Sequence, residues 1–153
     1  PGWVSTGMGR RQAFLDWMDT VGLDSDPDLV EEADWYQVEP GNLAALELLG
    51  RHPDLTAIVA ANDLLGLGCY RAARSLGRAI GVDISITGYN DMPLLDLMQP
   101  SMTSVRVPYR QMGADAATTL LDLISNEEVS AGPVRLAPTL AIRASTAPPP
   151  SKD

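Results

Sequence analysis

The chain of 153 residues has the length of one domain, and its 45 % hydrophobic and 20 % charged residues are ordinary for a globular protein. Its net charge of -9 repels phosphate backbones and its basic residues form no stripe, so the chain itself is not expected to bind DNA or RNA. No apolar run can cross a bilayer, nothing resembles a signal peptide, and one cysteine fits a reducing compartment, which predicts a cytoplasmic protein without membrane contact.

A helix is predicted near the N-terminus, starting at residue 5 or 6 and ending at residue 22. Its buried face is indicated by the i, i+3, i+4, i+7 spacing of Phe14, Trp17, Met18 and Val21. Arg10 shares this inward face, because it lies four residues before Phe14. A buried guanidinium needs acceptors, so Arg10 either pairs with Asp63 or Asp91 or reaches a bound ligand.

Trp35 follows in a loop or strand end, before a second helix that is predicted over residues 40–50. Tryptophan offers the largest flat apolar face on which a sugar ring can stack. Trp35 is therefore either a ligand-stacking residue or an ordinary core tryptophan.

The clearest unit spans residues 55–88. It consists of an apolar strand at 56–61, a helix that Asn62-Asp63 caps and Gly77 ends, and a second strand at 84–88. The predicted core stripe of this helix is Leu65, Cys69, Ala72, Ala73 and Leu76. A strand, a helix and a strand in this order fit a right-handed crossover in a parallel sheet. The alternation along the chain predicts an α/β fold with an open, Rossmann-like parallel sheet flanked by helices.

Polar residues follow both strands of this unit, where open parallel sheets bind their ligands. Asn62 follows the first strand and Asn90 the second. Each amide offers donors and an acceptor, which suits sugar hydroxyls. The structural alternatives are a helix cap for Asn62 and a turn for Asn90.

The rest of the chain is less regular. An extended stretch is predicted at 103–107, a helix at 110–125, a polar loop at 126–133, and short strands at 134–136 and 140–143. The proline-rich segment 147–150 is expected to be extended or disordered.

No catalytic or metal site is predicted. His52, the single histidine, precedes Pro53 in a polar turn without a second histidine or a cysteine nearby. Cys69 falls on the core stripe of its helix. We therefore expect no metal, no cofactor and no enzymatic activity.

Apolar side chains also lie outside the core stripe of the helix after residue 62, and in the loop after residue 91. So much apolar surface indicates a partner subunit, and the alternative is a wide core under a second layer of helix. The residues of the predicted dimer interface are Leu64, Leu67, Tyr70, Arg71, Arg74, Leu94, Leu95 and Leu97.

Several segments in a fixed order resemble the effector-binding domain of the LacI/GalR family of bacterial transcription repressors. They are Ala57-Ile58-Val59-Ala60-Ala61-Asn62-Asp63 with Gly66-Leu67-Gly68, then residues 83–91, residues 100–105, Met112-Gly113 and Arg143-Ala144-Ser145-Thr146. No single segment is decisive, but their order and spacing together are specific.

The resemblance implies two Rossmann-like subdomains with a ligand between them, as in periplasmic sugar-binding proteins of type I. Residues 1–107 plus 137–147 would form the C-terminal subdomain, residues 108–136 would cross into the N-terminal subdomain, and residues 148–153 would be a tail. Most of the N-terminal subdomain and the DNA-binding headpiece would lie upstream, so the chain resembles a truncated member.

The resemblance also implies ligand contacts for Arg10, Trp35, Asn62 and Asn90, with Tyr109 as a weaker candidate. Asn90 stands where family members usually carry an aspartate that accepts from sugar hydroxyls. An amide can donate as well as accept and carries no charge, which leaves the identity of the sugar open.

The function implied is the sensing and dimerisation domain of a LacI-type regulator. A small carbohydrate would control operator binding allosterically, and operator DNA would be contacted through the missing headpiece. The alternative is a secreted sugar-binding protein of a transport system, which shares the fold.

Overall fold

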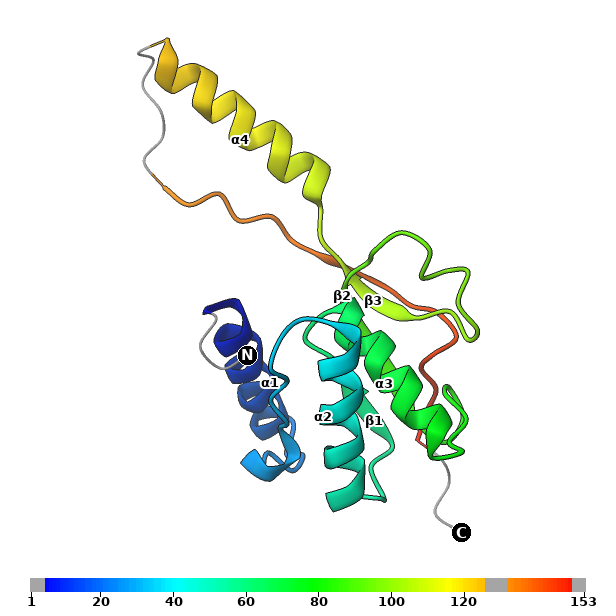
Figure 1. The fold of residues 1–153 in the computed structure, drawn as a ribbon. Coiled ribbons are helices and arrows are strands. Elements are labelled where there is room, and N and C mark those ends of the chain that lie inside the picture. Colours follow the sequence, from blue (N-terminus) through cyan, green and yellow to red (C-terminus); the bar gives the residue numbers. More distant parts are fainter. Residues whose placement is uncertain (1–4, 126–131, 150–153) are drawn as a thin grey trace.

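The computed structural model describes residues 5–125 and 132–149, and its centre is a four-stranded sheet in the order β1-β2-β3-β4 (Figure 1). β1 (Ala57–Val59), β2 (Ser85–Asn90) and β3 (Thr103–Arg106) are parallel. β4 (Thr139–Ala141) runs antiparallel to β3. The sheet is therefore mixed, whereas a parallel sheet was predicted. The strand expected at 134–136 is wrong, because these residues make no ladder.

The predicted strand–helix–strand unit is present as β1, α3 (Asp63–Ser75) and β2. Asn62 caps α3, with its side-chain Oδ1 accepting from the backbone N–H of Leu65 at 2.8 Å. Leu65, Cys69, Ala72 and Ala73 of α3 are buried, as their spacing predicts. The predicted stripe extended to Leu76, which is instead exposed, because it is the C-cap and lies past the last helical turn.

α2 (Val38–Arg51) packs against α3 through glycines. A side chain at Gly41 would lie 2.7 Å from the backbone of Leu65. One at Gly68 would collide with the backbones of Val38 and Asn42. The two helix backbones therefore approach at a distance that no larger residue permits.

α1 (Ser5–Thr20) lies beside this core and not within it (Figure 1). The prediction that its apolar face is buried is wrong, since α1 has no buried residue and Trp17 is 65 % exposed. The polar residues between the predicted core positions weaken the apolar stripe, so the helix lies beside the core without burying a side chain. A short 3-10 helix, η1 (Pro27–Leu29), follows before α2.

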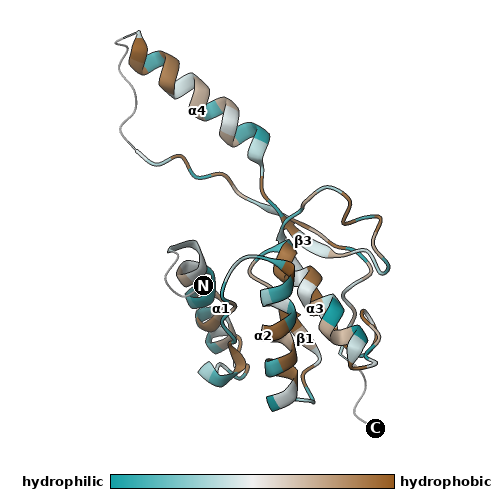
Figure 2. Ribbon diagram, in the orientation of Figure 1, coloured by the Kyte–Doolittle hydropathy of each residue, from teal (hydrophilic) through white to brown (hydrophobic). Residues whose placement is uncertain are grey.

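α4 (Tyr109–Ile124) projects away from the sheet, and the return segment to β4 runs beside it (Figure 1). Both line an apolar groove of about 600 Å³. Figure 2 shows hydrophobic residues along α4, and the exposed ones are Leu120, Leu121, Leu123 and Ile124. Most of the predicted loop 126–133 and the end of the proline-rich segment lie outside the described residues. None of the described helices is long and apolar enough to cross a membrane.

Candidate functional site

The site lies at the carboxyl end of β1 and β2. Ile58 pairs with Ile86 and Val59 with Thr87, and the backbone N–H of Ala60 donates to Thr87 at 3.0 Å. This register brings the residues after β1 level with the last residues of β2. Asn62 and Asn90 therefore belong to the same edge, as the sequence predicts.

Arg10 joins this edge from α1. Its Nη1 donates to the carbonyl oxygen of Ala61 at 2.6 Å, and its guanidinium carbon lies 3.9 Å from the centre of the Tyr89 ring. A cation over an aromatic face is attracted by the negative face of the ring. Of the alternatives left open for Arg10, the ion pairs with Asp63 and Asp91 are absent, because both carboxylates are bonded elsewhere.

Tyr109, the first residue of α4, reaches the same place from the other direction. Its hydroxyl donates to Oδ1 of Asn90 at 2.7 Å. Burial raises the pKa of Tyr109, and the nearby positive charge of Arg10 partly opposes that rise. Arg10, Asn62, Asn90 and Tyr109 thus lie together at the end of β1 and β2.

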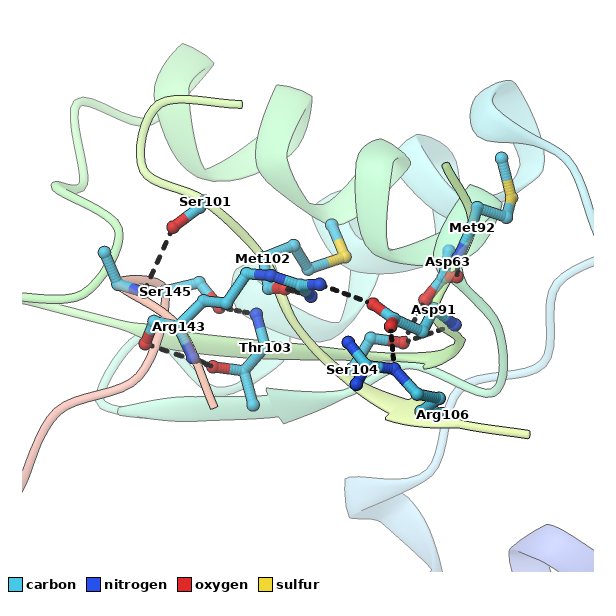
Figure 3. Close-up of polar contacts among 11 residues, drawn as sticks. Asp63, Asp91, Met92, Ser101, Met102, Thr103, Ser104, Arg106, Arg143 and Ser145 are labelled. Carbon is cyan, nitrogen blue, oxygen red and sulfur yellow. Dashed lines mark hydrogen bonds and ion pairs between the residues drawn. The ribbon is translucent and has the colours of Figure 1, made fainter. Parts of the chain in front are cut away.

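Behind this edge lies a network that sequence reasoning missed (Figure 3). Asp91 accepts from Nε of Arg106 at 2.6 Å and from Nη2 of Arg143 at 2.7 Å. Burial alone would raise the pKa of Asp91, but these two charge-assisted hydrogen bonds outweigh it and hold the pKa below its ordinary value. β2 is therefore tied to β3 and to the segment after β4.

Asp63, the first residue of α3, links β3 to the turn after β2. Its side chain is fully buried and accepts from the Ser104 hydroxyl at 2.6 Å and from the backbone N–H of Met92 at 2.8 Å. Ser104 in turn accepts from the backbone N–H of Asp91 at 3.0 Å. These bonds hold Asn90 and Asp91 at φ values of 119° and 54°, in a region that non-glycine residues seldom adopt. The backbone conformation of the turn after β2 is thereby fixed.

Trp35 lies in the segment between η1 and α2, which reaches the same end of the sheet (Figure 1). Its side chain is 44 % exposed, and its ring centre lies 6.2 Å from that of Tyr36. An indole so exposed is not an ordinary core tryptophan. Its stacking on a ligand stays a prediction.

The predicted dimer surface is divided between two environments. Tyr70 and Leu95 are 2 % and 3 % exposed, so these two lie in the core of the chain and cannot contribute to a surface between subunits. Leu94 and Leu97 are exposed, while Arg71 forms an ion pair with Glu39 at 2.7 Å. Arg74 donates to the carbonyl of Gln99. Part of the predicted surface is thus available to a partner.

An α/β sheet whose carboxyl edge gathers a cation, two amides and a phenol is of the class that binds a small polar ligand. The profile of the periplasmic binding protein-like domain matches residues 2–146. The chain belongs to the family of periplasmic binding protein-like domains, and the proteins it is similar to include LacI-family transcriptional regulators.

Three regulators show what the chain is similar to. The HTH-type transcriptional regulator MalR of Streptomyces coelicolor is 38 % identical over 137 residues, which are 88 % of this chain and 39 % of MalR. The transcriptional regulator CelR in complex with cellobiose has a TM-score of 0.84 and 35 % identity, over 95 % of this chain and 44 % of that one. A LacI family regulator from Arthrobacter sp. FB24 in complex with lactose has a TM-score of 0.79 and 26 % identity, over 89 % and 50 %. The chain spans less than half the length of the curated regulators it matches.

Proposed function

We propose that this chain is the effector-sensing part of a LacI-type transcriptional regulator and that it binds a small carbohydrate. The observation that carries the proposal is the convergence of Arg10, Asn62 and Asn90 at one end of the sheet. The cellobiose and lactose complexes of the two similar regulators support a sugar as the effector. The alternative of a secreted transport protein is not favoured, since the relatives are regulators.

The division of the chain into subdomains is part of this proposal. Residues 1–107 and 137–147 would form one subdomain, residues 108–136 would belong to a second, and residues 148–153 would be a tail. The projecting α4 supports this division, because its apolar side chains are exposed in the described residues. A ligand between the two subdomains would favour one of their arrangements and so change operator binding.

The proposed regulator acts as a homodimer that contacts operator DNA through a headpiece outside these residues. Leu64, Leu67, Leu94 and Leu97 would contribute to the dimer surface. A regulator acts where the DNA is, which places the protein in the bacterial cytoplasm. We propose no catalytic step, because the carboxylates of Asp63 and Asp91 are occupied by structural bonds.

The test is a thermal-shift screen of sugars, including cellobiose and lactose, on the full gene product that contains these residues. A bound effector raises the melting temperature in proportion to its saturation. The Arg10→Ala variant is expected to keep its fold and lose the response, while Arg11→Ala, an exposed neighbour on the same helix, keeps both. A response that Arg10→Ala leaves unchanged contradicts the assignment of the site.

A further inference from the structure

Some polar atoms at the carboxyl edge of the sheet already form hydrogen bonds within the chain, and others do not. Oδ1 of Asn62 accepts from the backbone N–H of Leu65, and Oδ1 of Asn90 accepts from the hydroxyl of Tyr109. Within the described residues, no partner accepts from either Nδ2. Both amides can therefore offer a ligand their N–H groups, while each oxygen already accepts one hydrogen bond and keeps one further lone pair.

The carboxylates behind the edge are occupied as well. Each oxygen of Asp91 accepts from an arginine, and each oxygen of Asp63 accepts from Ser104 or Met92. The acidic segment 31–34 lines a separate hollow against α2. The cluster formed by Arg10, Asn62 and Asn90 thus presents a cation and free amide N–H groups, and the carboxylates behind it are bonded elsewhere.

No carboxylate among the residues that the structure describes neutralises the charge of Arg10. Its guanidinium contacts a carbonyl oxygen and an aromatic ring, and no carboxylate of the described residues lies at ion-pair distance from it. Arg143, by comparison, is also half-buried and bonds to Asp91. A charge that is partly buried is costly unless it is paired, so Arg10 favours a site that an anion completes.

We infer that the ligand carries an anionic oxygen group, a carboxylate or a phosphate, which is bound by Arg10 and by the Nδ2 groups of Asn62 and Asn90. The inference rests on the proposed function and narrows it from sugars in general to acidic sugars. A neutral hydroxyl can also accept from these donors. An anion gains more, because hydrogen bonds to a charged acceptor are roughly twice as strong as neutral ones.

The test compares sugars that share a ring and differ in charge. Isothermal titration calorimetry on the full gene product would use glucose, glucuronate and glucose 6-phosphate, the corresponding galactose series, and cellobiose with cellobionate. The acidic member of the series that binds is expected to bind about 10- to 100-fold more tightly than its neutral counterpart. Whether the uronate or the phosphate binds better identifies the source of the charge. The advantage should decrease as salt is raised.

Two variants each make the cluster less positive by one charge. Arg10→Gln removes the cation, and Asn90→Asp adds a carboxylate beside it. Both are expected to abolish the preference for the acidic sugar, and Asn90→Asp is expected to reverse it, because it repels an anion and can accept from hydroxyls. Arg11→Gln removes the same charge from an exposed position one residue away and should leave the preference intact.

The outcomes separate this inference from the proposed function. A neutral sugar that binds as tightly as its acidic counterpart overturns the inference and leaves the sugar sensor standing. A preference for the acidic sugar that persists in both Arg10→Gln and Asn90→Asp also overturns it. Binding of no sugar in any series contradicts the proposed function and the inference together.

Discussion

Asp63 is the buried carboxylate on which the geometry of the site depends, and its replacement by alanine is expected to destabilise the protein strongly. The side chain accepts two hydrogen bonds, from the hydroxyl of Ser104 and from the backbone of Met92. Each hydrogen bond to a charged group contributes about 1.5–3 kcal/mol. Both donors are left without an acceptor in Asp63→Ala, so the expected loss is about 3–5 kcal/mol of unfolding free energy.

Replacing Asp63 by asparagine is expected to cause an intermediate loss of unfolding free energy. Asp63→Asn keeps the shape of the side chain and one carbonyl oxygen, so that one of the two donors retains its acceptor. Its expected loss is roughly half that of Asp63→Ala. Asp54→Ala is the matched control, because Asp54 is exposed and should change the unfolding free energy by less than about 0.5 kcal/mol.

Urea unfolding of the purified protein, followed by circular dichroism, measures all three variants, and the slope with denaturant shows whether the unfolding transition stays comparable. The expected order of loss is Asp63→Ala, then Asp63→Asn, then Asp54→Ala. Equal losses for Asp63→Ala and Asp54→Ala would refute the reasoning, since the two bonds would then contribute nothing. An Asn variant as unstable as the Ala variant would show that the charge, and not the acceptor geometry, is responsible.

Three further predictions concern packing, pH and reactivity. Gly68→Ala should lower the unfolding free energy by about 1–3 kcal/mol, because its Cβ meets the backbone of α2. Gly50→Ala has open space around it and should raise the unfolding free energy by about 0.5–1 kcal/mol. If thermal unfolding ranks the two variants in the opposite order, the close contact between α2 and α3 is contradicted. The pKa of Asp91 is lower in the folded than in the unfolded state, so its stabilisation is present above about pH 4 and is lost as pH falls through the folded value. Unfolding at several pH values should therefore show a gap between wild type and Asp91→Asn that narrows in acid; a gap that stays constant down to about pH 2 contradicts it. Burial raises the pKa of the Cys69 thiol to about 12, so a thiol reagent at about pH 8 should label Cys69 in urea and not in the native protein; rapid native labelling would disprove its burial.

Local signals account for the parts of the fold that the sequence predicts correctly. The apolar run before residue 62, the side chain of Asn62 and the glycine at 77 each determine a nearby piece of backbone, and together they specify β1, α3 and β2. The buried face predicted for α1 failed because burial depends on what packs against a helix. Periodicity alone carries no information about that.

The site was predictable in its position but not in its bonding. Asn62 and Asn90 could be placed at one edge because parallel strands end together. The bond between Asp91 and Arg143 joins residues 52 positions apart, and the bond from Arg10 to Ala61 joins residues 51 apart. Such pairs are decided by the tertiary fold, so the sequence left the partner of Arg10 open between two carboxylates and a ligand.

Tyr109 shows why those long-range bonds matter for function. Because its hydroxyl donates to Oδ1 of Asn90, the amide is turned so that both N–H groups stay free for a ligand, while the oxygen keeps one lone pair. Tyr109 is also the first residue of α4, the helix that leaves the sheet. One hydrogen bond therefore joins the Asn90 amide, which a ligand would meet, to the first residue of α4. A ligand that competes for Asn90 must act on α4 as well, and a movement of α4 must change what Asn90 can bind.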